Sequence, residues 1–263
     1  MKFYKMRTAI KVIRTIRNWP LFYADALSLI RPKIVVYRLR NGIAYKTRSR
    51  SYDKYVISEI WIDRCYTPEG FEVGEGSLVV DIGAQIGVFT ILAAKASRTG
   101  RVFSIEPVPW NFDLLESNIL LNNVQNVRPM QLAVSHGMGF RELFLSDMSG
   151  GHSFLSDLSG SRKIVVEAMS LKDIVERNNI ERIDFLKVDC EGAEYEILFN
   201  CPDEVLDIIG KISMEVHSMK GNDILTMETY LRGKGFEVIS RPHKAAPLSG
   251  MIYAQRHDRA IAT

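Results

Sequence analysis

Two carboxylates stand where short apolar segments of the sequence end. Asp81 lies in the segment 78–82, which runs into a turn with glycines at both ends, and Glu106 ends the next such segment. Glycine lets a ligand approach the backbone closely. An acid at the end of the second strand of a nucleotide-binding α/β unit accepts hydrogen bonds from ribose hydroxyls. This pattern predicts a site for a cofactor that contains adenosine.

The charges around the turn favour S-adenosylmethionine over a dinucleotide. A diphosphate needs the backbone donors of a GxGxxG turn, whereas Gly83 and Gly87 have the spacing GxxxG. Asp81 would repel a diphosphate but attracts the sulfonium and ammonium groups of S-adenosylmethionine. The two alternatives are a nicotinamide dinucleotide and a turn whose glycines serve only the packing of strand against helix.

A second group of titratable residues, Asp189, Glu191, Glu215 and His217, follows or ends two later apolar segments. Ligands of open α/β sheets bind beyond the carboxyl ends of the strands, so we expect these four side chains to converge on one catalytic edge. Glu215 and His217 are two residues apart and share one face of a strand. We expect His217 or Asp189 to act as the general base that takes a proton from the substrate. The alternative is that each is a hydrogen-bonded structural residue.

A divalent metal is the other way to lower the pKa of a substrate group. Oxygen atoms of Asp189, Glu191 and Glu215 would suit Mg²⁺, because hard cations prefer oxygen ligands. Their spacing is not specific for a metal, and we therefore favour a site without one. Cys190, in the same segment, is expected to be a small core residue and not a nucleophile.

Residues outside these segments are candidates for acceptor binding. His152 and Ser153 follow a Gly-Gly pair, although a plain polar loop is an equal alternative. Asp53, Glu59 and Tyr66 precede the core on an element that we expect to fold over the cleft. The alternative for this element is a solvated helix face.

The elements that position these residues begin after Gly76, where short apolar segments alternate with amphipathic ones. This alternation is typical of βαβ units, and it predicts a doubly wound α/β fold with a mostly parallel seven-stranded sheet. The expected strands are residues 78–82, 102–106, 127–134, 183–188, 212–217, 236–240 and 251–255, and the expected helices are 88–97, 112–121, 171–178, 193–199 and 224–234. Residues 141–168 interrupt the alternation and predict a hairpin with mobile loops.

Residues 1–73 are expected to form a basic N-terminal extension of helix, hairpin and cap, ahead of a methyltransferase domain at 74–263. An amphipathic helix begins at Lys2 and meets Trp19-Pro20, the pair Asn41-Gly42 predicts a hairpin, and residues 51–63 have a helical pattern. Residues 1–50 contain 13 Lys and Arg and one acid, which leaves 21 basic and 30 acidic residues for the rest. Such an arm attracts an anionic membrane surface, an acidic substrate or nucleic acid, and solvated helix charges are the alternative.

Four segments resemble the FkbM family of methyltransferases: VDIGAQIG at 80–87, SIEP at 104–107, KVDCEGAE at 187–194 and MEVH at 214–217. The resemblance implies the Rossmann-like class I methyltransferase fold. It also implies methyl transfer from S-adenosylmethionine to a hydroxyl of a sugar, glycan or small-molecule natural product. The implied cofactor contacts are Asp81, Gly83, Gln85, Gly87, Glu106, Pro107 and Asn111. Gln85 stands where the family usually has Asn, and both side chains carry an amide.

Composition excludes several other classes of protein. The three cysteines are never spaced as CxxC, which argues against a disulfide framework or a zinc ribbon. No apolar run approaches the roughly 18 residues of a membrane span, so we expect a cytoplasmic protein, peripheral to a membrane at most through its basic helix. An RNA methyltransferase and an inactive binding module of the same fold are the alternatives. Nucleic acid is not expected, because an aromatic stacking platform is missing, and Asp81, Glu106 and Asp189 argue for activity.

Overall fold

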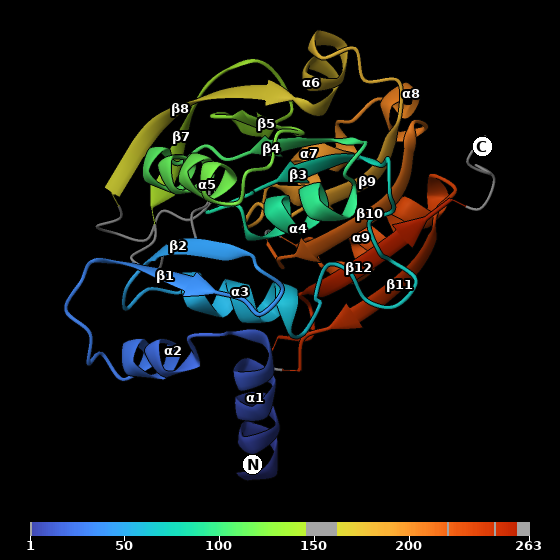
Figure 1. Ribbon diagram of the computed structural model, residues 1–263. Coiled ribbons are helices and arrows are strands. Elements are labelled where there is room, and N and C mark those ends of the chain that lie inside the picture. The colour runs from blue at the N-terminus through green and yellow to red at the C-terminus, as the bar shows by residue number, and fades with distance from the viewer. Residues whose placement is uncertain (1, 146–161, 220, 245, 257–263) are drawn as a thin grey trace.

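The computed structural model describes residues 2–145, 162–219, 221–244 and 246–256. Its centre is a seven-stranded sheet with the order β11-β12-β10-β9-β3-β4-β5 (Figure 1). The strands are β3 (Leu78–Ile82), β4 (Arg101–Ile105), β5 (Val127–Met130), β9 (Ile183–Val188), β10 (Ile209–Val216), β11 (Glu237–Pro242) and β12 (Gly250–Gln255). Neighbours pair in parallel except that β12 is antiparallel to both β10 and β11. The expected doubly wound, mostly parallel sheet is confirmed.

Successive side chains of a strand point to opposite faces of the sheet, and here apolar side chains point to both. Helices therefore cover both faces. In β3, Val80 and Ile82 belong to the apolar cluster formed with α6 (Leu171–Arg177), α7 (Glu194–Phe199), α8 (Asp203–Leu206) and α9 (Ile224–Gly233). Val79 faces the other way, toward α4 (Val88–Ala96) and α5 (Pro109–Leu121). Helix α5 begins three residues before the expected 112, because Pro109 is well suited to the first turn of a helix.

A second, three-stranded sheet stands beside the end of the main one. It consists of β6 (Ala133–Ser135), β8 (Arg162–Ser170) and β7 (Gly139–Leu145) in that order. Strands β7 and β8 are antiparallel, which confirms the hairpin expected in this region. The single strand expected at 127–134 is wrong: β5 ends at Met130, and β6 pairs with β8 instead of continuing beside β4.

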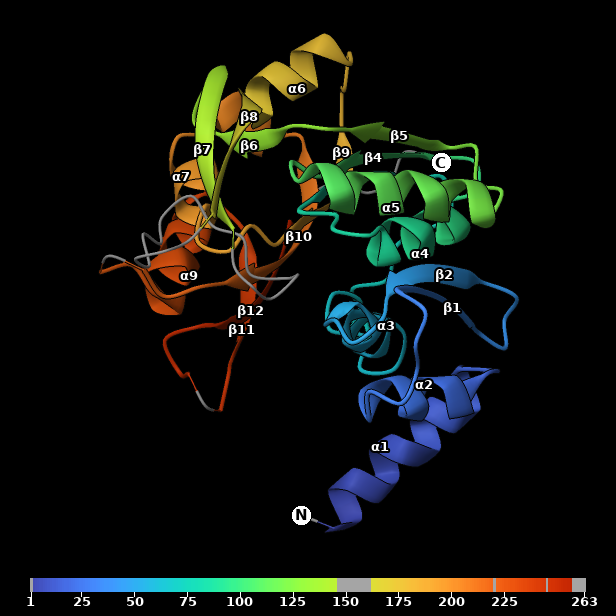
Figure 2. The same ribbon diagram turned by 90° about the vertical axis from the view of Figure 1, so that its left-hand side faces the viewer.

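The N-terminal segment consists of α1 (Lys2–Thr15), α2 (Trp19–Ala26), β1 (Ile34–Arg38), β2 (Ala44–Arg48) and α3 (Asp53–Trp61). Strands β1 and β2 form the expected hairpin, and Pro20 lies in the first turn of α2. Tyr37, Tyr45 and Ile57 pack in one apolar cluster with Val88 and Phe89 of α4. Figure 2 shows this segment stacked below α4, with α1 projecting away from the body. The N-terminal segment therefore shares its core with one face of the main sheet.

Within the described residues, no helix combines the length and the apolar character that crossing a membrane requires.

Candidate active site

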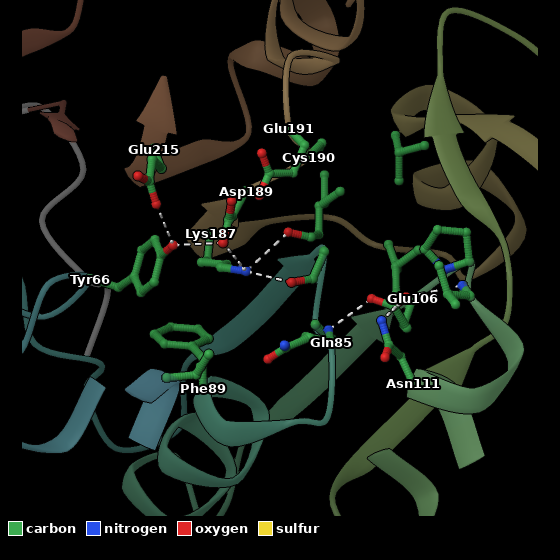
Figure 3. A pocket seen from close by; sticks show the side chains of 18 of the residues that line it. Tyr66, Gln85, Phe89, Glu106, Asn111, Lys187, Asp189, Cys190, Glu191 and Glu215 are labelled. Carbon is green, nitrogen blue, oxygen red and sulfur yellow. Dashed lines mark hydrogen bonds and ion pairs between the residues drawn. The ribbon is translucent and has the colours of Figure 1, made fainter. Parts of the chain in front are cut away.

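A cavity of about 490 Å³ lies at the carboxyl ends of β3, β4, β9 and β10. Side chains of α3 and of the segment after it, including Glu59 and Tyr66, line its other side. A cavity of this volume is in the usual range for small-molecule sites. The strand ends and the N-terminal segment thus enclose one site between them (Figure 3).

One half of the cavity is built around Glu106, which follows β4. Its buried carboxylate accepts hydrogen bonds from the backbone N–H of Gln85 at 2.8 Å, the N–H of Val108 at 3.0 Å and Asn111 Nδ2 at 3.2 Å. Burial raises the pKa of Glu106, and these three bonds oppose that shift. Asn111 Oδ1 is buried beside it and has no hydrogen-bond partner among the described residues. This half therefore offers acceptor oxygens to a ligand rich in hydroxyl and amine groups.

Five of the seven expected cofactor contacts line this cavity, and two do not. Gly83, Gln85, Glu106, Pro107 and Asn111 line it, whereas Asp81 and Gly87 lie behind its wall.

The two glycines of the turn are needed for contacts within the chain. Gly83 has φ +76°, and a Cβ there would lie 1.8 Å from the carbonyl oxygen of Asp189. Gly87 has φ +84°, and a Cβ there would lie 2.5 Å from Leu115 Cδ1 of α5. Left-handed backbone conformations favour glycine, and the close neighbours exclude a side chain. Gly83 thereby lets the ends of β3 and β9 come together at the cavity.

Asp81 is fully buried and is held by side chains of two neighbouring elements. Thr90 of α4 donates a hydrogen bond of 2.7 Å to its Oδ2, and Lys187 Nζ of β9 lies 3.4 Å from its Oδ1. Lys187 also donates to the carbonyl oxygen of Gly83 at 2.6 Å. Burial lowers the pKa of Lys187, but the charges of Asp81 and Asp189 outweigh burial and raise it. Lys187 is therefore a buried ammonium that holds the glycine turn after β3 in place.

The other half of the cavity contains a chain of hydrogen bonds over the ends of β9 and β10 (Figure 3). Tyr66 donates to Asp189 Oδ2 at 2.8 Å and lies 3.4 Å from Glu215 Oε2. His243 Nε2 lies 3.0 Å from Glu215 Oε1, and Lys187 Nζ lies 3.7 Å from Asp189 Oδ2. Burial, with the charge of Asp189, raises the pKa of Glu215. The structure thus brings the two strand-end carboxylates together through a tyrosine of the N-terminal segment.

His217 lies in the same half, between carboxylates. Its Nδ1 is 3.1 Å from Glu194 Oε1, a carboxylate with no exposed surface, and its Nε2 is 3.4 Å from Glu191 Oε2. Burial lowers the pKa of His217, but the hydrogen bond with Glu194 and the charges of Glu194, Glu191 and Asp189 outweigh burial and raise it to about 10. Burial raises the pKa of Glu191 to about 8. His217 is therefore an imidazolium at neutral pH.

Asp189, Glu215 and His217 each have an atom that could bind a metal ion, and these three atoms all lie within 4.8 Å of one another. This separation is compatible with a divalent cation bound by the two carboxylates and by His217, which must lose its proton first because only a neutral imidazole binds a metal. Each of the three side chains already has a protein partner, in Tyr66, His243 and Glu194 respectively.

Of the remaining residues expected to bind the acceptor, one lines the cavity, one does not, and two lie outside the described residues. Glu59 lines the cavity, and burial raises its pKa. Asp53 does not line it: this buried carboxylate pairs with Arg48 of β2 at 2.8 Å. His152 and Ser153 lie outside the described residues.

Sequence reasoning gave no role of their own to three residues of the site, Lys187, Glu194 and His243. A lysine inside the apolar segment 183–188 is a signal for the first, because lysines are almost never fully buried unless paired. Glu194 belongs to the DCEGAE segment, but nothing in the sequence links it to His217. His243 follows β11, whose approach to β10 through β12 is visible only in the fold.

Comparison with known proteins assigns the chain to a family. The profile described as the Methyltransferase FkbM domain matches residues 81–238, which include Glu106 in one half of the cavity and Asp189 and Glu215 in the other. The chain belongs to the FkbM methyltransferase family. It is accordingly an S-adenosylmethionine-dependent methyltransferase with a Rossmann-like class I fold.

Three relatives of this FkbM-family protein match it over most of their length. Methyltransferase 1 of Beauveria bassiana is 29% identical over 215 residues, covering 74% of this chain and 85% of the relative. The 31-O-demethyl-FK506 methyltransferase FkbM of Streptomyces tacrolimicus is 28% identical over 235 residues, 77% of this chain and 89% of the relative. Hexuronic acid methyltransferase AglP of Haloferax volcanii is 25% identical over 218 residues, 80% and 84% respectively. Among solved structures, M. jannaschii TYW2 in complex with AdoMet has 17% identity and a TM-score of 0.49, covering 87% of this chain and 89% of that one.

Proposed function

We propose that this FkbM-family enzyme methylates a hydroxyl of a sugar, glycan or small natural product. The observation that carries the proposal is one cavity with two chemically different halves, Glu106 with Asn111 at one end and Asp189 with Glu215 at the other. The names of two relatives agree with an oxygen acceptor of this kind: one is a 31-O-demethyl-FK506 methyltransferase, and one is a hexuronic acid methyltransferase.

The residues of the first half fit S-adenosylmethionine. Glu106 presents carboxylate oxygens suited to ribose hydroxyls. Asn111 Oδ1, which has no hydrogen-bond partner among the described residues, is suited to a hydrogen-bond donor of the ligand. Asp81 acts through Lys187, which holds the Gly83 carbonyl, and not by direct contact. When bound, the cofactor supplies an electrophilic methyl group. The chain's own residues align the acceptor oxygen with it, and alignment supplies much of the rate of such a displacement.

We assign the acceptance of the proton to Asp189. Asp189 follows β9, its backbone carbonyl faces Gly83, and both residues line the cavity, so Asp189 lies where the two halves of the cavity meet. His217 is already protonated at neutral pH, and it lies between the carboxyl groups of Glu191, Glu194 and Glu215. Tyr66 holds Asp189 through its hydroxyl and fixes the direction of the carboxylate. A divalent cation held by Asp189, Glu215 and His217 is the alternative route to an alkoxide.

The test of the function is the bond that carries the transferred methyl group. The purified enzyme is incubated with methyl-labelled S-adenosylmethionine and a mixed extract of sugars, glycans and metabolites, and the labelled products are identified. We expect the label in a methyl ether of a hydroxyl. Label on a nitrogen, or on RNA added to a parallel sample, would contradict an oxygen acceptor.

A further inference from the structure

The loop that follows α2 displays apolar and basic side chains and no acidic one. Residues 27–34, here named the 27–34 loop, comprise this loop and the first residue of β1; in them Leu27 is 69% exposed, Leu29 72% and Ile34 44%. Arg31 and Lys33 of the same loop are exposed as well. Exposed apolar side chains grouped in this way mark an interaction surface more often than isolated ones do.

The two leucines are held outward by a hydrogen-bonded turn. At the end of α2, Ser28 N–H donates to the carbonyl of Asp25 at 2.9 Å and Leu29 N–H to that of Ala24 at 2.8 Å, with Ser28 at φ +57°. This is the Schellman arrangement, in which the residue at the Leu29 position commonly packs back on the helix. Here Leu29 is exposed instead. The hydrogen-bonded turn thus fixes the backbone of Leu29 while its side chain stays exposed.

The surface around this loop is cationic because the acid beneath it is neutralised. Asp25 is buried and accepts hydrogen bonds from Tyr37 OH at 2.8 Å and from the backbone N–H of Arg50 at 2.7 Å. Lys54 Nζ, also buried, lies 3.2 Å from Asp25 Oδ2. The exposed charges next to the leucines are those of Arg31, Lys33 and Arg50.

Aromatic residues connect this surface with the active-site cavity. Tyr55 of α3 is 40% exposed, and its ring meets Phe22 of α2 edge-on at 6.2 Å. The ring of Tyr52 lies 5.5 Å from that of Tyr55, is 41% exposed and lines the cavity. Amphipathic tyrosine rings favour the boundary between water and lipid.

We propose that the 27–34 loop docks this enzyme on an anionic phospholipid bilayer. Leu27 and Leu29 enter the boundary between headgroups and acyl chains, while Arg31, Lys33 and Arg50 meet the lipid phosphates. Charge complementarity favours this occupant over a second copy of the chain, because a two-fold contact through the same patch would bring like charges together. Docking places the Tyr52 side of the cavity next to the bilayer.

Vesicle binding of the full chain tests this proposal. Cosedimentation is measured with vesicles of phosphatidylcholine alone and of phosphatidylcholine with phosphatidylglycerol, for the wild type and for Leu27→Glu/Leu29→Glu. Leu120→Glu is the matched control, because Leu120 of α5 is 80% exposed outside the patch. We expect binding only to the anionic vesicles, weakened about tenfold or more by the double substitution and by Arg31→Glu/Lys33→Glu, and unchanged in the control.

Three outcomes would overturn the proposal. Wild-type protein could ignore phosphatidylglycerol, the Leu120→Glu control could lose as much binding as the double variant, or the double variant could bind vesicles normally while converting a dimer into a monomer. Donor binding is measured on every variant to verify folding. Because this readout does not involve methyl transfer, failure of the docking proposal leaves the proposed function standing.

Discussion

At the scale of single residues, Glu106 is the side chain on which the cofactor half of the cavity depends. Its carboxylate collects Gln85, Val108 and Asn111 at the cavity wall. Glu106→Ala removes the acceptor for the ribose hydroxyls, and we expect donor affinity to fall by about 2 kcal/mol, as for hydrogen bonds to a charged group. Calorimetric titration with S-adenosylmethionine measures this loss. Glu116→Ala, an exposed acid on the same helix α5 as Asn111, is the control and should bind normally.

The protonation state of His217 makes a prediction about pH. Its pKa is raised to about 10, so the imidazolium is present at neutral pH and is lost as the pH rises through that value. We expect turnover to fall as the pH rises through this pKa, which gives the pH profile a descending limb at high pH, because the neighbouring carboxylates lose the positive charge of His217. A histidine that accepted the substrate proton would give the opposite sign, with turnover increasing as the pH passes its pKa.

The measurement is turnover from about pH 6 to about pH 11 for the wild type, for His217→Gln and for His136→Gln. Glu191, with a pKa of about 8, titrates in the same window, so only a limb that disappears in His217→Gln is assigned to His217. His136, whose side chain is 54% exposed, is the control. A limb that increases toward high pH and vanishes in His217→Gln would return the role of base to His217.

At the scale of elements, the site depends on how closely β3 approaches β9. Gly83→Ala would place a Cβ 1.8 Å from the Asp189 carbonyl, and the backbone there must move. We expect the free energy of unfolding to fall by about 3 kcal/mol or more, with loss of donor binding. Gly42→Ala is the control: its φ of +91° is similarly left-handed, but no atom of the described residues lies within 4 Å of the added Cβ, so only about 1–2 kcal/mol should be lost. Equal losses in denaturant titrations would contradict the role of the close approach.

Elements were predictable from the sequence where local pattern and final fold agree. After Gly76, short apolar segments alternate with amphipathic ones, because the strands are buried on both faces of the sheet and the helices on one side only. This pattern located β3, β4, β9 and β10 within a few residues. The pairing of β6 with β8 was not predictable, because an apolar segment does not reveal which neighbour its backbone will meet. The strand-end rule located Asp189, Glu215 and His217 on the cavity wall. It could not show that the Asp81 side chain is buried outside the cavity. That placement depends on the pairing of Asp81 with Lys187, which is set by the register between β3 and β9.

At the scale of the whole molecule, the N-terminal segment and the sheet form one core. Tyr37, Tyr45 and Ile57 cover Val88 and Phe89 of α4, and Asn118 of α5 binds the backbone of β2 through Lys46. We expect a chain that begins at residue 74 to lose cooperative unfolding, because it exposes this apolar face to water. Thermal unfolding of the truncated and full chains measures it. A truncated chain that unfolds cooperatively at the same temperature would show that residues 74–263 fold independently.

The most direct test of the proposed reaction is turnover of Asp189→Asn on an identified acceptor, with donor affinity measured in the same preparation. We expect turnover to fall about a hundredfold or more while S-adenosylmethionine still binds, because the amide cannot take the hydroxyl proton. His217→Gln and wild type with and without a chelator are measured in parallel. Near-normal turnover of Asp189→Asn with an inactive His217→Gln would contradict the assignment, and so would activity that chelation abolishes and Mg²⁺ restores.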